Sequence, residues 1–226
     1  MKRIHPKRVM FGFAAEIAKA LAHPARVELL DLLAQGSRSV DSAAKAASLS
    51  VANASQHLQQ LKQAGLLSAQ RVGKQTVYQL ADESVVEVLR TVSGFADRHL
   101  ADAERAIANL YRARDPIAPV SSAELLKRIK EGTGLTIDVR PALEYRAAHI
   151  PHAINMPVDD IAKHIADIPP ASDIVTYCRG PYCVFAYQAI EVLRPAGRQA
   201  RRLQGGFLEW RLNRLPLEGD EVPGVL

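Results

Sequence analysis

The stretch SVANASQHLQQLKQAGLLSAQRVGKQTVYQL, residues 50–80, decides the fold of the first half of this 226-residue chain. Ser50 is a natural N-cap for a helix over about 51–64, and Gly65 ends that helix. After Gly65 the period changes, and apolar residues recur at about every second position on both sides of a tip that contains Lys74. This pattern predicts a helix followed by a β-hairpin with a basic tip.

The residues around this stretch complete a recognisable order of elements. Helical spacing predicts two helices within 13–35, on either side of His23-Pro24, and a short Ala-rich helix at about 40–47. After the hairpin, one long helix over about 83–111 carries a broad apolar face. We expect that face to form a dimer interface, with packing inside its own domain as the alternative. The order predicts a mostly-α winged helix-turn-helix with a β-hairpin wing.

The Ser50-capped helix has the side chains that DNA recognition requires. Residues 50–63 contain no Asp or Glu, and a projecting helix fits the major groove, which is about 12 Å wide. The alternative is a solvated polar surface. The side chains expected to contact bases or phosphates are Ser50, Asn53, Ser55, Gln56, His57, Gln60 and Lys62, with Arg71 and Lys74 from the hairpin tip.

The charge distribution agrees with a polyanionic partner for the first half. Residues 1–115 hold 16 Lys and Arg against 11 Asp and Glu, and residues 116–226 hold 13 of each. The whole net charge of +5 therefore lies in the first half. This asymmetry favours binding of double-stranded DNA there.

The composition is that of an ordinary globular protein, with 48% hydrophobic and 23% charged residues. No run approaches the roughly 20 apolar residues that cross a bilayer, and the N-terminus does not fit a secretory signal. Two cysteines in a chain of this length do not make a disulfide scaffold. We therefore expect a cytoplasmic protein with no membrane partner.

The second half changes character. Residues 112–120 contain two prolines and are expected to form a linker, after which Ser121 and Glu124 form a capping-box pattern. Short β-branched runs then alternate with helical segments, which predicts an α/β domain with a mainly parallel sheet. The expected organisation is a winged-helix and dimerisation domain over 1–111, a linker over 112–120 and an α/β domain over 121–226.

Both cysteines of the chain lie in YCRGPYC, residues 177–183. Cys178 ends an apolar strand, and a helix is expected to begin near Cys183. Ligand sites of parallel sheets lie at the carboxyl ends of the strands, where loop N–H groups and helix N-termini stabilise anions. This position should lower the pKa of the Cys178 thiol below its ordinary value of about 8.5 and make it nucleophilic.

Residues 17–80 resemble the ArsR/SmtB family of winged-helix repressors. HPARVELLDLLAQG is similar to the second helix of that family, and RVGKQTVYQL to its wing. LSVANASQHLQQLKQAGLL is similar to its recognition helix, with Ser55, His57, Leu58 and Leu61 at the typical places. The resemblance implies a homodimer, formed through the N-terminal helix and the 83–111 helix, on a two-fold DNA operator, with repression relieved by an inducer.

The chain departs from the metal-sensing members of this family. Many of them use a cysteine pair before the recognition helix, where this chain has SRSVDSAAKAAS. A second family site uses carboxylates and histidines on the last helix. Candidate ligands near that site are Asp97, His99, Asp102 and Glu104, but the positions around Asn109 and Leu110 offer none. We therefore expect no metal site in the winged helix and no cofactor.

Residues 120–219 resemble the rhodanese family. IDVRPALEYRAAHIPHAINMP is similar to its first signature, with Asp138 and Arg140 after a strand and His152 in place of the usual Gly. LQGGFLEW followed by LPLE is similar to its closing signature. The resemblance makes Cys178 the catalytic cysteine, which takes up a sulfane sulfur as a persulfide. The implied active-site loop is Cys178, Arg179, Gly180, Pro181, Tyr182 and Cys183.

The remaining loop residues allow several interpretations. A related fold that cleaves phosphate esters has an arginine six positions after the cysteine, where this chain has Val184. Cys183 could attack a Cys178 persulfide or sulfenic acid and close a disulfide or polysulfide bridge, could pack inertly, or could contribute to a metal site. Arg179 either steers an anionic sulfur donor or is a solvated surface charge.

Together these features predict a homodimeric DNA-binding repressor that senses or transfers a sulfane-sulfur donor or a thiol oxidant at Cys178 with Cys183. Three alternatives remain. The chain could be an active sulfurtransferase with an attached DNA-binding domain, an ordinary repressor whose second domain is a passive dimerisation module, or an arsenic- or mercury-responsive repressor that uses the two thiols.

Overall fold

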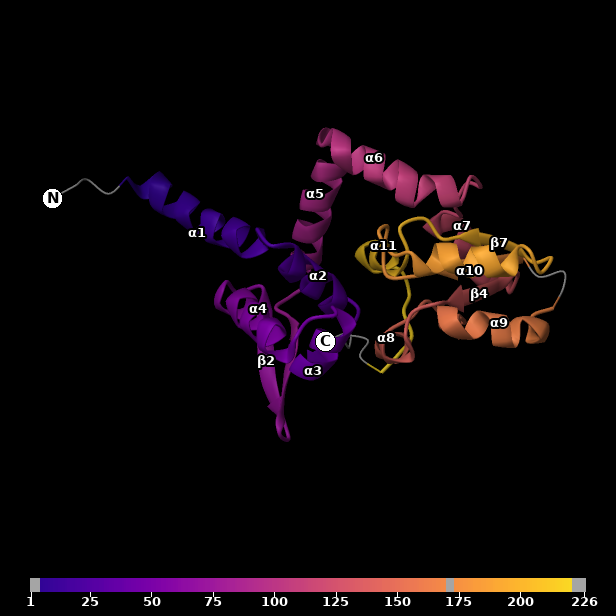
Figure 1. The fold of residues 1–226 in the computed structure, drawn as a ribbon, viewed down its shortest axis with the longest axis horizontal. Helices are drawn as coiled ribbons and strands as arrows, with labels where there is room; N and C mark the ends of the chain where they lie inside the picture. The colour runs from indigo at the N-terminus through magenta and orange to yellow at the C-terminus, as the bar shows by residue number, and fades with distance from the viewer. Residues whose placement is uncertain (1–4, 170–172, 221–226) are drawn as a thin grey trace. The chain divides into compact units, whose positions relative to one another are not determined.

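The computed structural model describes residues 5–169 and 173–220. The chain divides into two compact units, Met1–Ser93 and Gly94–Leu226, and Figure 1 shows the elements of each. The division falls inside helix α5 (Ser84–His99), so that one continuous helix begins in the first unit and ends in the second. No helix within the described residues is long and apolar enough to cross a membrane.

The first unit is a winged helix-turn-helix, as the sequence predicts. Its three strands form a small antiparallel sheet in the order β1-β3-β2, and β2 and β3 form the wing. Its elements are α1 (Pro6–Leu21), α2 (Pro24–Leu33), β1 (Arg38–Ser39), α3 (Val40–Ala46), α4 (Val51–Gln63), β2 (Leu67–Val72), β3 (Gln75–Leu80) and α5.

Local side chains explain where these elements begin and turn. The ring of His23 accepts a hydrogen bond from the N–H of Ala25 and caps α2, and the hydroxyl of Ser50 accepts one from the N–H of Asn53 and caps α4. In the wing, Gly73 has a φ of 59°, a left-handed conformation that costs glycine little. The caps and the hairpin thus confirm the elements expected around residues 50–80.

A single core holds the first unit together. It is built from the leucine face of α2, the inward face of α4 and the first turns of α5. Leu29, Leu30, Leu58 and Leu61 are fully buried there. Burial of such side chains contributes about 1.5–3 kcal/mol each, so this core positions α4 with respect to α2.

The expected single helix over 83–111 is wrong. The structure has two helices, α5 and α6 (Ala101–Leu110), because Leu100 between them has an extended backbone. The charges favour such a break, since Arg98 and His99 lie in the last turn of α5 and acidic side chains lie in the first turn of α6. Basic residues are stabilised at a helix C-terminus and acidic ones at an N-terminus.

The second unit is an α/β domain with a four-stranded parallel sheet, in the order β5-β4-β6-β7. This confirms the predicted mainly parallel sheet. Its strands are β4 (Leu135–Asp138), β5 (Ile154–Asn155), β6 (Asp173–Tyr177) and β7 (Gln199–Arg202). Its helices after α6 are η1 (Arg112–Arg114), α7 (Ser122–Glu131), α8 (Ala142–Ala147), η2 (Val158–Asp160), α9 (Ile161–His164), η3 (Ile165–Asp167), α10 (Phe185–Leu193) and α11 (Phe207–Leu212).

Helices cover both faces of this sheet. Ile174 of β6 belongs to a core shared with α9 and α10, whereas Val175 and Tyr177 belong to a core shared with α7 and α11. This alternation follows the two-residue period of a strand. Strand β6 is an inner strand, flanked by β4 and β7, and its carboxyl end carries Cys178. The cysteine loop therefore begins at the middle of the sheet.

Residues 112–120, expected to be a linker, are attached to the second unit. Asp115 has a side chain that is 1% exposed and pairs with Arg194 of α10 and Arg202 of β7. Val120 bridges to Leu203 beside β7. A segment with these contacts is not a free spacer. The domain boundaries at 111 and 121 stay a prediction.

Candidate functional site

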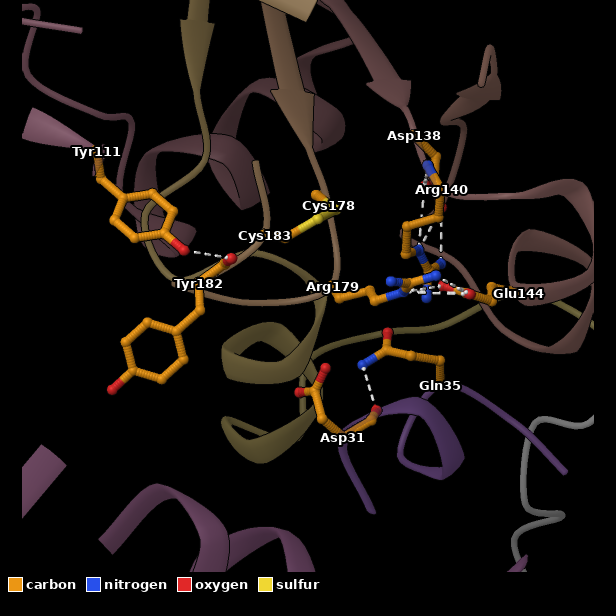
Figure 2. Close-up of a disulfide and its surroundings, with 10 residues drawn as sticks. All are labelled: Asp31, Gln35, Tyr111, Asp138, Arg140, Glu144, Cys178, Arg179, Tyr182 and Cys183. Carbon is orange, nitrogen blue, oxygen red and sulfur yellow. Dashed lines mark hydrogen bonds and ion pairs between the residues drawn. A yellow bond between two sulfur atoms is a disulfide. The ribbon is translucent and has the colours of Figure 1, made fainter. Parts of the chain in front are cut away.

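The two cysteines are joined by a disulfide in the loop that follows β6, and Figure 2 shows this bond. Their Cα atoms are 6.1 Å apart, within the range that a disulfide spans without backbone movement. Cys178 is 2% exposed and packs with the α9 and α10 core, whereas Cys183 is partly exposed. Because both thiols are consumed in this bond, the lowered pKa expected for the Cys178 thiol stays a prediction.

The closing signature LQGGFLEW holds the beginning of this loop. The N–H of Phe207 donates to the carbonyl of Cys178, and the N–H of Leu208 donates to the carbonyl of Arg179. Gly206 makes this approach sterically feasible, because a Cβ at that position would lie 2.6 Å from the Cys178 carbonyl oxygen. Its φ of 77° also favours glycine. Residues 29 positions apart in the chain thus form one site.

Arg179 does not extend freely toward a donor. It donates hydrogen bonds to both carboxylate oxygens of Glu144, with distances of 2.7–3.2 Å. The side chain of Glu144 is 1% exposed and comes from α8, on the other side of the site (Figure 2). The interpretation of Arg179 as an anion-steering or solvated charge therefore does not describe this state, in which its charge is balanced by a buried carboxylate.

Asp138 and Arg140 form a second ion pair, fully buried, beside the first. Arg140 also donates to the carbonyl of Ala148 and lies 3.9 Å from the ring centroid of Phe207. Burial alone would lower the pKa of the Arg140 guanidinium, but Asp138 outweighs it and the pKa is raised. Asp138 and Arg140 therefore hold the chain after β4 in place.

His152 occupies a position where the rhodanese signature has a glycine. Its φ of 60° is left-handed, which is strained for a residue with a Cβ. Its N–H lies 3.3 Å from a carboxylate oxygen of Glu218. The structure thus gives a physical reason for the glycine that His152 replaces.

The predicted DNA-contacting residues divide into two groups. The first group is exposed and lies on α4, at its N-cap and on the wing. It consists of Ser50, Asn53, Gln56, Lys62, Arg71 and Lys74. Ser55, His57 and Gln60 are partly buried. Gln60 accepts a 2.6 Å hydrogen bond from Arg26 of α2, and its contact with DNA stays a prediction.

His57 is also held inside the first unit. Its ring centroid lies 4.5 Å from that of His23, and its Nδ1 is buried without a hydrogen-bond partner. Burial lowers the pKa of His57, and the neighbouring His23 and Arg26 lower it further. The ring of His57 therefore packs on the residue that caps α2, a contact that the polar character of the sequence did not predict.

No group of three or more His, Cys, Asp or Glu side chains within 5–169 and 173–220 is placed to hold a metal ion. The residues that sequence reasoning missed are Glu144, which binds Arg179, and Asp97 and Tyr111, which both bond to Tyr182. Glu144 lies four positions after Arg140 inside the first rhodanese signature. Its place in that signature could have marked it as a candidate site residue. No motif in the neighbouring sequence identifies Asp97 or Tyr111 as a partner of Tyr182.

Comparisons with known proteins match each unit to a family. Residues 23–69 match the model of the bacterial regulatory protein arsR family, and residues 121–213 match that of the rhodanese-like domain. An HTH-type transcriptional regulator of Mycobacterium tuberculosis, Rv0324, is 43% identical over 212 residues, which are 94% of this chain and 93% of the relative. The chain therefore belongs to the ArsR family of HTH-type transcriptional regulators, and a rhodanese-like domain follows its winged helix.

Two further relatives each cover one part of the chain. A sulfurtransferase of Allochromatium vinosum is 30% identical over 104 residues, which are 45% of this chain and 95% of that protein. The solution structure of the homodimeric winged helix-turn-helix DNA-binding domain of Mb0332 from Mycobacterium bovis is 37% identical. It covers 45% of this chain and 94% of that chain, with a TM-score of 0.41.

Proposed function

We propose that this regulator is a homodimeric, cytoplasmic repressor that responds to reactive sulfur or a thiol oxidant through Cys178 and Cys183. The observation that carries the proposal is the disulfide between these two residues at the end of an inner strand of the rhodanese-like sheet. A sulfurtransferase needs only one cysteine, whereas a reversible switch needs two that can meet. The winged-helix and dimerisation domain, residues 1–111, would bind the operator, and the domain over 121–226 would sense.

The chemistry of the switch requires no bound cofactor. The Cys178 thiolate attacks a sulfane sulfur atom of a polysulfide, forms Cys178 persulfide and expels the shortened polysulfide. The Cys183 thiolate then attacks Sγ of Cys178, forms the disulfide and expels hydrosulfide. The two thiols lose two electrons in this sequence, and the sulfane sulfur takes them up and leaves as sulfide. Two molecules of a cellular thiol then reduce the protein disulfide by exchange: the first forms a mixed disulfide with one cysteine, and the second releases that cysteine and leaves as a disulfide with the first.

The exposed polar face of α4 and the basic wing support DNA binding. Gln56 and Asn53 are solvent-exposed amides on α4, and Lys74 is exposed at the wing tip. Amides read adenine edges in the major groove, and lysines neutralise phosphates. Gln60 and His57, which are held by α2, would act by orienting α4.

Exposed apolar side chains on the long helices support a dimer. Phe11 and Phe13 of α1 are 62% and 65% exposed, and Phe95 of α5 is 59% exposed. Such a density of exposed aromatic residues is typical of a surface that another protein covers. The Mb0332 domain is described as homodimeric, and a two-fold dimer would place two α4 helices on a two-fold operator.

Operator binding in two redox states tests the proposal. A labelled DNA duplex, selected from a random library by the protein reduced with dithiothreitol, serves as the probe for fluorescence anisotropy at fixed salt. We expect polysulfide treatment to weaken binding at least about fivefold in the wild type. Cys178→Ser and Cys183→Ser should show no change. An arsenite arm on reduced protein tests the metalloid alternative, and unchanged affinity of the polysulfide-treated wild type would refute the switch.

A second candidate function is sulfur transfer as a steady-state activity. The similarity to the Allochromatium vinosum sulfurtransferase over 95% of that protein favours it. Turnover of thiosulfate and cyanide by the wild type, lost in Cys178→Ser and retained in Cys183→Ser, would support an enzyme. Loss of turnover in Cys183→Ser as well would support a reaction that needs both cysteines.

A further inference from the structure

Tyr182, inside the cysteine loop, bonds to a residue of α5 and to the residue that follows α6. Its hydroxyl donates to the carboxylate of Asp97, 2.7 Å from each oxygen, near the end of α5. Its main-chain carbonyl accepts a 2.7 Å hydrogen bond from the hydroxyl of Tyr111, which follows α6 (Figure 2). The residue directly before Cys183 is thus bonded outside the loop at both its side chain and its backbone.

Helix α5 connects this contact to the winged helix along one continuous stretch of backbone. Val85 and Leu89, in its first turns, are buried in the core that also holds α2 and α4. Asp97, eight residues after Leu89, carries the bond to Tyr182. Leu89 and Asp97 both lie in the helix Ser84–His99, so the backbone between them is regular helix, and eight such residues rise about 12 Å.

The contact around Tyr111 is itself firmly anchored in the second unit. The ring centroid of Tyr111 lies 5.5 Å from that of Tyr187 in α10, and burial raises the pKa of the Tyr111 hydroxyl. The following residues are tied down by Arg114, which pairs with Glu191, and by Asp115. Tyr182 therefore bonds through its main chain to Tyr111, which packs on α10, and through its side chain to α5.

Opening of the disulfide must move this part of the loop. Bonded sulfur atoms are about 2.05 Å apart, whereas non-bonded heavy atoms keep roughly 3.5 Å or more. Reduction therefore separates the two sulfur atoms by about 1.5 Å. Cys178 is buried at the end of β6, and its carbonyl is held by Phe207. Cys183 and its neighbour Tyr182 lie on the more exposed side and take up the displacement.

We propose that Tyr182 is the positioning residue that transmits the state of the Cys178–Cys183 pair to α5, through its hydrogen bond to Asp97. The inference rests on the proposed function of the pair. In the disulfide form the bond to Asp97 holds the end of α5, and in the reduced form the loop shifts and releases it. The winged helix thereby binds DNA differently in the two states.

The test compares DNA affinity in both redox states for variants that leave the cysteines intact. Tyr182→Phe removes only the hydroxyl group. Asp97→Asn removes the negative charge that accepts the hydrogen bond from this hydroxyl. Asp102→Asn, on the exposed side of α6, is the matched control. The selected DNA duplex is the probe, and mass spectrometry of alkylated protein measures disulfide formation after polysulfide treatment.

We expect the ratio of oxidised to reduced Kd to fall from at least about fivefold in the wild type to near one in Tyr182→Phe and Asp97→Asn. All variants should still form the disulfide, and Asp102→Asn should keep the wild-type ratio. A wild-type ratio in Tyr182→Phe would overturn the coupling while leaving the switch intact. A ratio of one in the wild type itself would overturn the proposed function, and the coupling with it.

Discussion

The guanidinium of Arg179 donates two hydrogen bonds to the Glu144 carboxylate in a bidentate ion pair, with Nη2 2.7 Å from Oε1 and Nε 2.9 Å from Oε2. Arg179 belongs to the cysteine loop, and Glu144 belongs to α8. The pair joins the loop to the segment that follows Arg140 and balances the charge next to Cys178. Bidentate geometry and burial make it stronger than a surface ion pair.

Replacement of Glu144 by Gln should destabilise the second unit. The change leaves the guanidinium of Arg179 partly buried without its counter-charge, which costs roughly 3 kcal/mol of unfolding free energy. The single tryptophan, Trp210, is fully buried in this unit, and its fluorescence during urea unfolding measures the effect. Glu131→Gln is the control, because Glu131 forms an exposed pair with Lys127 worth about 0.5 kcal/mol or less. Equal unfolding curves for the two variants would contradict the prediction.

Asp115 should make part of the stability of the second unit dependent on pH. Burial alone would raise the pKa of Asp115, but hydrogen bonds from Arg194 and Arg202 outweigh it, and the pKa lies below its ordinary value. A depressed folded-state pKa contributes stability above the unfolded value of about 3.9, and this contribution is lost as the pH falls through the folded value.

Asp115→Asn should therefore lower the unfolding free energy by about 2 kcal/mol at pH 7. The difference from the wild type should shrink as the pH falls below about 4, where the wild-type carboxylate also becomes protonated. Urea unfolding followed by Trp210 at several pH values measures both effects. A difference that stays constant down to pH 3 would show that the ion pairs of Asp115 do not stabilise the fold.

His152→Gly should stabilise the second unit by about 0.5 kcal/mol. The left-handed backbone at His152 strains a side chain that glycine lacks, and this relief exceeds the entropy that glycine adds to the unfolded chain. The same substitution at His164, whose φ is −105°, should instead destabilise by about 0.5–1 kcal/mol. Thermal unfolding of the two variants under one set of conditions gives the comparison. A lower Tm for His152→Gly than for the wild type would contradict the prediction.

Two variants of the winged helix should weaken DNA binding in different ways. Lys74→Ala removes a phosphate contact, so affinity should fall for every sequence and the slope of log K against log salt should decrease by about one. Gln56→Ala should cost about 1–3 kcal/mol on the selected duplex and little on random DNA. Lys127→Ala, an exposed lysine of α7, is the control. An unchanged salt slope in Lys74→Ala would remove the wing tip from the interface.

Much of the fold could be predicted because its signals are local. Ser50 and Ser121 accept the hydrogen bonds expected of N-caps, and the alternation on both sides of Gly73 forms the wing. Strands alternating with helices gave the parallel sheet. The break at Leu100 was missed because apolar periodicity continues across it, although the charges on each side favour two helices.

The arrangement of the candidate site could be predicted from the sequence only in part. Cys178, Arg179 and Tyr182 were marked by their place in the loop, but their partners Glu144, Asp97 and Tyr111 lie 35 to 85 residues away in the chain. Periodicity and spacing report only on neighbours in the chain. The same limit explains why the contacts of His57 with His23 and of Gln60 with Arg26 were not expected, whereas their contact with DNA stays a prediction.

The sequence by itself determined the order of the two domains, the recognition helix with its wing, and the position of both cysteines after a buried strand. These follow from capping residues, apolar period and spacing, which act within a few residues of each other. Only the tertiary structure decided that Arg179 is neutralised by Glu144 and that Tyr182 is bonded to α5. Such pairs form when folding brings distant segments together, and the free energy of burying a charge or a polar group depends on the partner that it meets there.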